Sequence, residues 1–449
     1  MISLRPYQQQ MVHQIRLRYQ SGHRSVLAVL STGGGKTRIF SYIAHAAARK
    51  GNRVLILVHR AELLDQASRS LPLQHGIIAA GRGMDLSHAV QVASVQTVAK
   101  RLHLLPPDHF QLIVVDEAHH TTAGTWAKVL QHFRSAKLLG VTATPIRGDG
   151  RGLGEHYQVM VQGPVAQWLT DNGYLAAAKV LAPPGFDSTG LRQRMGDFDQ
   201  QQAEQRVRAI HGDCVSHYRQ HLAGRTAIAF CCSVAHAEAV AALFLQAGIP
   251  AASIDGKMDA TTRRQLLSDL GTGRIKVLTS CALIGEGVDV PSVGGCILLR
   301  PTKSVALHLQ MIGRCLRPAP GKPAAVVLDH VGNTMHCGHH LEPRDWTLDG
   351  ITKRDRSAAP SIKVCPQCFA AMASQARQCL ECGHQFAPEV RELEQVDGEL
   401  VELAARERKR EQGGAQSLDD LRQLAQQRGY KRGWAERVYQ ARLAKRHGL

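Results

Sequence analysis

Residues 31–37 have the types and spacing needed to hold a chain of phosphates. The run reads Ser-Thr-Gly-Gly-Gly-Lys-Thr and lies between an apolar stretch ending at Leu30 and a helical pattern over residues 38–48. Glycines in such a turn let backbone N–H groups converge on phosphate oxygens, a lysine reaches the outer phosphates, and a threonine hydroxyl suits Mg²⁺. The candidates are Thr32, Gly33, Gly34, Gly35, Lys36 and Thr37. Leu30 replaces the first glycine of the strict pattern, and a glycine-rich turn with a surface lysine is the alternative.

Two adjacent acids follow the apolar run Leu112–Val115. Asp116 and Glu117 are expected at the carboxyl end of a strand, which is where open α/β sheets bind ligands. Asp116 is therefore a candidate for holding Mg²⁺, and Glu117 for orienting and deprotonating an attacking water. Together with the loop, the pair predicts hydrolysis of a nucleoside triphosphate. A solvated pair of loop charges is the alternative.

The elements that must position these residues are expected to form parallel sheets. Short apolar runs alternate with helical patterns up to residue 335, which is typical of α/β folds. A first set of strands is expected at Ser25–Leu30, Val54–Val58, Val90–Ala93, Leu112–Val115 and Lys137–Val141. A second set is expected at Thr226–Phe230, Ala251–Ile254, Lys276–Thr279, Cys296–Leu299 and Ala325–Leu328. Between the sets, residues 183–208 lose strand periodicity and are interpreted as a linker followed by an entry helix.

Length and charge limit the class of protein. The chain has 449 residues, about three times the ~150 of a typical domain, so two or three domains are expected. With 44% hydrophobic and 20% charged residues it has the balance of a folded protein, not of a disordered one. The 55 Lys and Arg exceed the 37 Asp and Glu by 18. This excess favours a polyanionic partner, with nucleic acid as the leading candidate.

Four of the 11 cysteines are clustered in two Cys-x-x-Cys pairs ten residues apart. Cys365, Cys368, Cys379 and Cys382 have the spacing of a tetrahedral Zn²⁺ site in a zinc ribbon, with disulfides as the alternative. The other seven are scattered, which favours a reducing compartment. No signal pattern and no stretch of about 18 apolar residues is found, so a cytoplasmic protein without a membrane partner is expected.

Four further segments complete a pattern that resembles the superfamily 2 helicases and translocases of the DEAH-box type, after the box Asp116-Glu117-Ala118-His119. They are Leu4–Gln8, Thr142–Pro145, Glu286–Asp289 and Gln310–Arg317. The resemblance implies two tandem RecA-like domains with ATP bound between them. It implies adenine contacts at Arg5 and Gln8, coupling of hydrolysis to movement at Thr142 and Thr144, ATP contacts at Gly287 and Asp289, and arginine fingers at Arg314 and Arg317.

Physical reasoning supports two arginines in that role. Phosphoryl transfer spreads charge over the γ-phosphoryl oxygens, and guanidinium groups from a second domain stabilise this charge only when the cleft closes. Taken alone, Arg314 and Arg317 would be interpreted as solvated helix arginines three residues apart. The resemblance also implies nucleic-acid contacts at Arg60, Gln96, Thr97, Thr279 and Ser280. For Thr97 and Thr279, strand-end hydroxyls with local hydrogen bonds are the alternative.

These patterns predict a domain order. The expected boundaries are 1–165 for the ATP-binding RecA-like domain, 166–208 for the linker and entry helix, 209–335 for the second RecA-like domain, 336–360 for a connector, 361–388 for the zinc ribbon and 389–449 for a charged and basic helical tail. In the connector, His336, Cys337, His339 and His340 match no standard metal site and are expected in a polar loop. The basic, aromatic end of the tail suits single-stranded nucleic acid and a solvated helical hairpin about equally well.

The sequence therefore predicts an ATP-dependent helicase or translocase that uses ATP, Mg²⁺ and Zn²⁺. Its additions make the chain similar to helicases encoded by phages and prophages, which favours DNA over RNA as the track and replication or recombination proteins as partners. One alternative is a duplex translocase that does not separate strands, as in restriction motors. The other is a nucleotide-dependent binding platform that hydrolyses little ATP.

Overall fold

The protein is represented by a computed structural model. It describes residues 2–121, 124–147, 150–182, 188–194, 196–207, 211–281, 290–350, 362–387, 414–415, 417–431 and 433–446. Contacts divide the chain into two compact units, Met1–Phe386 and Ala387–Leu449. Within the described ranges, no helix combines the length and hydrophobicity needed to cross a bilayer.

The first sheet has seven strands, all parallel to their neighbours. In spatial order they are β3 (Gly76–Ile78), β4 (Val90–Ser94), β2 (Val54–Val58), β5 (Leu112–Asp116), β6 (Lys137–Thr142), β1 (Ser25–Val29) and β7 (Val159–Gln162). Alternate residues of one strand enter different cores: Val26 packs into the core on one face, and Leu27 into the core on the other. Burial on both faces explains why these strands are continuous apolar runs.

The second sheet has six parallel strands. In spatial order they are β12 (Ala251–Ile254), β13 (Val277–Ser280), β11 (Ala227–Phe230), β14 (Gly295–Leu298), β15 (Ala325–Asp329) and β8 (Ala178–Leu181). If the strands of each sheet are numbered by their order along the chain, the spatial order of this sheet is the same as that of the first sheet from β3 to β1. In this repeat β8 is the counterpart of β1, and β14 is the counterpart of β5.

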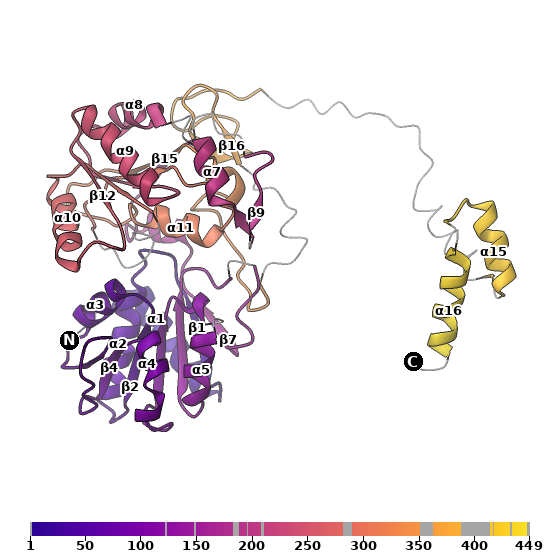
Figure 1. The fold of residues 1–449 in the computed structure, drawn as a ribbon, viewed down its shortest axis with the longest axis horizontal. Coiled ribbons are helices and arrows are strands. Elements are labelled where there is room, and N and C mark those ends of the chain that lie inside the picture. The colour runs from indigo at the N-terminus through magenta and orange to yellow at the C-terminus, as the bar shows by residue number, and fades with distance from the viewer. Residues whose placement is uncertain are drawn as a thin grey trace. The chain divides into compact units, whose positions relative to one another are not determined.

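Helices accompany both sheets (Figure 1). Those of the first half are α1 (Pro6–Gln20), α2 (Lys36–Ala48), α3 (Ala61–Ser70), α4 (Val95–Lys100), α5 (Gly124–His132) and α6 (Ala166–Asp171), with 3₁₀ turns at Leu102–Leu104 and Ala118–His120. Those of the second half are α7 (Gln200–Val207), α8 (His211–His221), α9 (Val234–Gln246), α10 (Ala260–Thr272), α11 (Val305–Gly313) and α12 (Asn333–Cys337). Side-chain caps begin several of them; for example, the Asp259 carboxylate accepts hydrogen bonds from the N–H groups of Thr261 and Thr262 at α10.

All ten strands expected from the sequence are present, with ends shifted by one residue at most. The prediction of two parallel α/β domains is confirmed. Of the described strands in the two large sheets, three were missed: β3, β7 and β8. The range 166–208 was expected to be a linker and entry helix, but its strand β8 is an edge strand of the second sheet. In the same range, β9 (Gln193–Arg194) and β10 (Asp197–Phe198) form a short antiparallel pair.

The four-cysteine segment contains an antiparallel pair, β16 (Ile362–Val364) and β17 (Ala371–Ala373). It docks on the free edge of β8, where the Ala182 N–H donates to the Phe369 carbonyl at 2.8 Å. Lys179 also forms an ion pair with Glu381 at 2.8 Å. The ribbon segment is thus held by an edge strand that the sequence reading placed in a linker.

The second unit contains α15 (Leu418–Gln427) and α16 (Trp434–Arg446), the two helices expected in the tail. Ser417 and Asp420 form a capping box at the start of α15. Arg422 on α15 bonds to Glu436 on α16 at 3.0 Å, and the Tyr430 and Trp434 rings lie 4.4 Å apart. The first part of the expected tail, residues 389–413, lies outside the described residues. In the described part, α15 and α16 form a helical hairpin.

Candidate nucleotide-hydrolysis site

The glycine-rich loop joins β1 to α2 with two residues in the left-handed region. Gly33 has φ 84° and Gly35 has φ 87°, and Gly35 is the N-cap of α2. L-residues with side chains rarely adopt this conformation, so glycine is required at both positions. The loop therefore ends at a helix N-terminus with Lys36 and Thr37 in the first turn, as an anion-binding loop requires.

Leu30 has a role that explains the departure from the strict glycine pattern. A Cβ built on Gly34 would lie 2.8 Å from Leu30 Cγ, because the leucine side chain fills the space beneath the loop. Leu30 is 2% exposed and belongs to the core. The missing first glycine thus leaves an apolar support under the loop.

Residues of α1 hold the loop from the other side. The Gln8 side-chain amide and the Tyr7 hydroxyl both donate to the Gly34 carbonyl, at 3.1 and 2.8 Å. Gln8 also accepts the Arg5 N–H at 3.0 Å and is 3% exposed. Gln8 is thereby engaged with the loop itself, whereas Arg5 is exposed, with its guanidinium 4.9 Å from the centre of the Tyr174 ring. Tyr7 lies inside the Leu4–Gln8 segment but was not singled out there, and Tyr174 was missed because no motif includes it.

The register of the sheet brings the acids to the same edge as the loop. Val29, the last residue of β1, is opposite Thr142 in β6, and Asp116, the last residue of β5, is opposite Val141. The first coupling threonine therefore stands between the phosphate loop and the acid pair. Because the carboxyl ends of parallel strands lie at the same edge of a sheet, the fold itself brings the phosphate loop, Thr142 and the acid pair together.

Glu117 has a strained backbone. Its φ and ψ are 51° and 56°, in the left-handed region that residues other than glycine rarely occupy. Its N–H donates to Asp116 Oδ1 at 3.0 Å, and its Oε2 lies 3.4 Å from His119 Nδ1. Both acids are buried to more than nine-tenths, as befits groups that act inside a closed site.

A short chain of polar contacts links Glu117 to Thr142–Pro145, the segment expected to couple hydrolysis to movement (the coupling segment). His119 Nδ1, which faces Glu117, also lies 3.2 Å from Thr142 Oγ1. The Thr142 hydroxyl donates to the Thr144 carbonyl at 3.0 Å and accepts the Thr144 N–H at 3.2 Å. Both threonines are fully buried. A change at the acid pair can therefore reach residues 142–144 through direct contacts.

Motif residues of the second half meet the loop at the end of α11. A Cβ built on Gly313 would overlap the Thr32 side chain, lying 2.6 Å from Thr32 Cβ, so only glycine allows this approach. Arg314 is the C-cap of α11 and is 7% exposed. Burial lowers the pKa of Arg317 to about 10, which leaves it cationic at neutral pH. Gly287 and Asp289 lie outside the described residues.

The residues expected to contact nucleic acid differ in accessibility. Arg60 is the N-cap of α3 and partly exposed, and the exposed Gln96 donates to the His59 carbonyl at 3.2 Å. Thr97 is 8% exposed. Two residues at the end of β13, Thr279 and Ser280, are fully buried, and the Thr279 hydroxyl donates to the Ala237 carbonyl at 2.7 Å. The Thr279 hydroxyl therefore bonds inside the protein to a residue 42 positions away on α9, which differs from the local hydrogen bond of the alternative.

The four clustered cysteines can hold one metal ion. The Sγ atoms of Cys365, Cys368, Cys379 and Cys382 all lie within 4.8 Å of one another. Burial alone would raise the pKa of the Cys365 thiol, but hydrogen bonds from the backbone N–H groups of Cys368 and Gln367 outweigh it and lower that pKa to about 7. Four cysteine sulfurs gathered this closely form the donor set of a structural Zn²⁺ site, so the residues present fit Zn²⁺.

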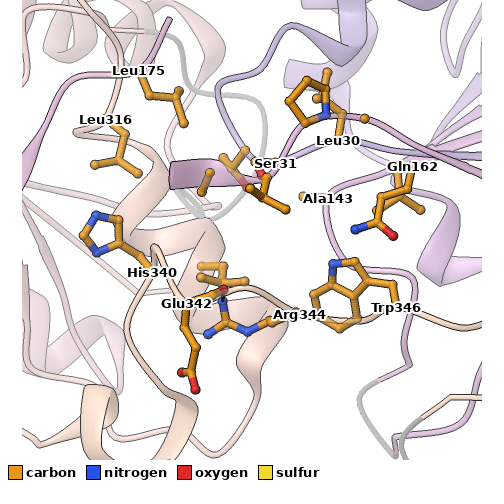
Figure 2. Close-up of a pocket in the computed structure, with 17 residues that line it drawn as sticks. Leu30, Ser31, Ala143, Gln162, Leu175, Leu316, His340, Glu342, Arg344 and Trp346 are labelled. Carbon is orange, nitrogen blue, oxygen red and sulfur yellow. Dashed lines mark hydrogen bonds between the residues drawn. The ribbon is translucent and has the colours of Figure 1, made fainter. Parts of the chain in front are cut away.

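A cavity of about 60 Å³ adjoins the start of the phosphate loop. Leu30, Ser31 and Thr32 line one side together with Ala143 of the coupling segment. The opposite side comes from the connector expected at 336–360 and is formed by His340, Glu342, Arg344 and Trp346 (Figure 2). The connector thus lies beside the site, which its composition did not indicate.

Two family models match this chain. Residues 1–147 match the model described as the type III restriction enzyme, res subunit, and residues 197–319 match the helicase conserved C-terminal domain. The two matches cover the segments that carry the loop, the acids and the α11 arginines. They leave the connector, the ribbon segment and the tail unmatched.

Similar proteins agree with these matches. A 51.5 kDa protein of a Lactococcus phage (isolate 7-9) is 35% identical, over 83% of this chain and 82% of its own length. A protein of Schizosaccharomyces pombe named as a mitochondrial ATP-dependent helicase, irc3, is 30% identical over 78% of this chain, which spans 60% of that relative. The structure of an HsdR-subunit fragment of a type I restriction enzyme from Vibrio vulnificus YJ016 has a TM-score of 0.58 at 22% identity, covering 77% of this chain and 67% of the fragment. With this site on two parallel-sheet domains, the chain belongs to the superfamily 2 helicases, the ATP-hydrolysing helicases and translocases of nucleic acid.

Proposed function

We propose that the protein is a nucleic-acid-stimulated ATPase of the DEAH-box type that moves along DNA. The observation that carries the proposal is the contact between the two halves at the site. Gly313 packs against Thr32, so the α11 end with Arg314 adjoins the loop that would hold the phosphates. Closing and opening this contact with each ATP would move the two domains relative to each other.

Each side chain has a definite task in this proposal. The loop N–H groups and Lys36 bind the β and γ phosphates. Thr37 and Asp116 supply the hard oxygen donors that Mg²⁺ prefers, and the bound ion would neutralise phosphate charge. Glu117 orients the attacking water and takes its proton, and Arg314 and Arg317 stabilise the charge that develops on the γ-phosphoryl group.

Base recognition is assigned mainly to Arg5. Gln8 already bonds to Gly34, so its part in this proposal is to hold the loop and, through the Arg5 N–H, the start of α1. The exposed Arg5 guanidinium and the neighbouring Tyr174 ring offer a flat surface for a base. Gly287 and Asp289 remain proposed ATP contacts.

The track is proposed to be DNA. The first domain matches a restriction-enzyme subunit and a relative is a phage protein, while the chain carries a net charge of +18. Arg60 and Gln96 are the accessible candidates for contacts to the strand, whereas Thr97 on α4 and Ser280 at the end of β13 are buried. Replication or recombination proteins remain the proposed partners.

The remaining parts have supporting roles. The ribbon, proposed at 361–388, would use one Zn²⁺ to fold a segment too small to fold alone. The tail, proposed at 389–449, adds a helical hairpin, and the two motor domains are proposed at 1–165 and 209–335. The strand β8 extends the second motor domain into the range 166–208.

The test is ATP hydrolysis by the full chain with single-stranded DNA, duplex DNA, forked DNA and RNA as separate stimulators. Stimulation by a DNA ligand is expected. A strand-displacement assay on the fork then separates a helicase from a duplex translocase, the second candidate, which the restriction-enzyme match favours. Hydrolysis that no nucleic acid stimulates would contradict the proposal and support a binding platform.

A further inference from the structure

The connector after α12 passes along the first domain, with residues 343–347 between a bend at Glu342 and a turn at residues 348–349. From Glu342 to Gly350 burial alternates: the even-numbered residues are partly buried and the odd-numbered ones exposed. A period of two means that one face of an extended chain is turned inward. The inward face carries Glu342, Arg344, Trp346 and Leu348.

Its far end docks on a glycine loop of the first domain. The Gly154 N–H donates to the Leu348 carbonyl at 2.9 Å, and Arg151 and Gly350 form an antiparallel bridge. A Cβ on Gly152 would overlap the Leu348 carbonyl, whereas a Cβ on Gly154 would lie 3.3 Å from it. Trp346 and Leu348 pack against the core on the face of the first sheet that contains Tyr157.

Its near end is fixed to the second domain by Arg344. This guanidinium donates to the carbonyls of Cys337 and His339, at 3.0 and 3.1 Å, and to that of Glu342 at 3.1 Å. Cys337 is the last residue of α12. Burial lowers the pKa of Arg344. A buried guanidinium that binds three carbonyls stiffens the turn from which the extended segment leaves.

Between these ends the segment faces the site. Figure 2 shows Arg344 and Trp346 side by side, facing Ala143 and Ser31, while the Glu342 carboxylate points away from them. The cavity between the two walls, about 60 Å³, has room for only a few waters. The segment therefore flanks both the phosphate loop and the coupling segment.

We propose that residues 342–350 are a strap through which the second domain positions the phosphate loop and the coupling segment. Arg344 and Trp346 are its positioning residues. The inference rests on the proposed function, because it assigns a task to the strap in ATP hydrolysis. Since one end is anchored beside α12 and the other on Gly152 and Gly154, movement of the second domain pulls directly on the wall of the site.

The experiment compares matched variants of the full chain. Arg344→Ala removes the anchor, and Asp345→Ala changes the neighbouring outward-facing residue. Gly152→Ala blocks docking of Leu348, and Gly83→Ala, also in the first domain, adds the same methyl group where no atom lies within 4 Å. For each we would measure kcat and KM for ATP with DNA, DNA affinity without ATP, melting temperature, and amide exchange of residues 30–37 and 142–146.

The strap predicts that Arg344→Ala and Gly152→Ala lower the stimulated kcat about tenfold, with unchanged DNA affinity. Exchange in the two loops should rise, and Arg344→Lys should restore activity in part. The two control variants should stay near wild type. The inference would be overturned if Arg344→Ala and Gly152→Ala had the kcat and amide exchange of the wild type. It would also be overturned if their fall in kcat were fully explained by a smaller fraction of folded protein. If the wild type does not hydrolyse ATP, the proposed function fails, and amide exchange still decides the strap.

Discussion

The two sheets of this protein share one strand order but differ in what their carboxyl edges carry. In the first, β1 leads into the glycine-rich loop, and β5 ends at Asp116. In the second, the counterpart of β1 is β8, whose following residue Ala182 bonds to the four-cysteine segment. The counterpart of β5 is β14, which is followed by the buried Leu299 and by Arg300.

The comparison shows that the fold provides the place for a site and that a few loop residues provide its chemistry. Among the described residues at the second edge, neither β8 nor β14 is followed by a phosphate loop or an acid pair. Arg314, at the end of the helix after β14, adjoins the loop of the first half. In the proposed function the first sheet binds ATP, and Arg314 of the second half completes the site.

The largest effect is expected at the residue that the second half delivers. Arg314→Ala should lower the stimulated kcat about 10³-fold, because the charge on the γ-phosphoryl group loses its guanidinium. ATP binding, measured with a fluorescent analogue, should weaken much less. Wild-type turnover in this variant would show that the second half does not complete the site.

Gly313→Ala sharpens the comparison, because it alters the contact between the halves and leaves every charged group in place. Its methyl group would overlap the Thr32 side chain. We expect a loss of about tenfold in kcat/KM for ATP. Gly321→Ala is the control, since a Cβ there meets no atom within 4 Å, although its φ of 70° adds some strain. Equal effects of the two changes would exclude a specific contact.

A smaller effect is expected from a change in the four-cysteine segment, which contacts the edge of β8. Cys368→Ser should abolish stoichiometric zinc in the purified protein, because a three-thiolate site binds the ion less tightly. Amide exchange of Lys179–Ala182 should rise, since the Lys179–Glu381 ion pair and the bond from Ala182 depend on the ribbon. Zinc content equal to that of the wild type would contradict the assigned site.

The smallest effect at neutral pH is expected for the stability of the second half, through three of its buried histidines. Burial lowers the pKa of His308 and His330 to about 3 and that of His339 to about 4. In the unfolded chain these histidines bind protons near pH 6.5. Their contribution to the free energy of unfolding is therefore fully present above that pH and is lost as the pH falls toward 4. Each histidine contributes a slope of about 1.4 kcal/mol per pH unit in this window.

Urea unfolding at pH 7, 6 and 5, followed by amide exchange, should therefore show the second half opening first. The His308→Gln variant should have a shallower pH dependence than the wild type. A first domain that opens before the second in acid would contradict this prediction.

Much of this architecture could be predicted from the sequence, because strands that are buried on both faces of a sheet are continuous apolar runs. Strand β8 was missed because only Val180 and Leu181 are fully buried there, next to the partly exposed Lys179. Its membership of the sheet depends on pairing with β15, which is distant in sequence. Strand β3 is only three residues long, too short for a pattern.

The site was predictable where backbone conformation or charge marks it. Gly33, Gly35 and the acid pair are required by local geometry, so their spacing can be recognised. Tyr7, Tyr174 and Trp346 act through contacts across the fold, and a single aromatic in a sequence is most often a core residue. The burial of Thr279 likewise depends on α9, which packs over β13.

The most direct test of the central claim is ATP hydrolysis by the wild type and by Glu117→Gln, with and without DNA. Glu238→Gln, an exposed acid on α9, is the matched control. The account predicts DNA-stimulated hydrolysis in the wild type and in the control. In Glu117→Gln it predicts a loss of about 10²–10⁴-fold with ATP binding retained. DNA-stimulated hydrolysis that survives in Glu117→Gln would contradict the account.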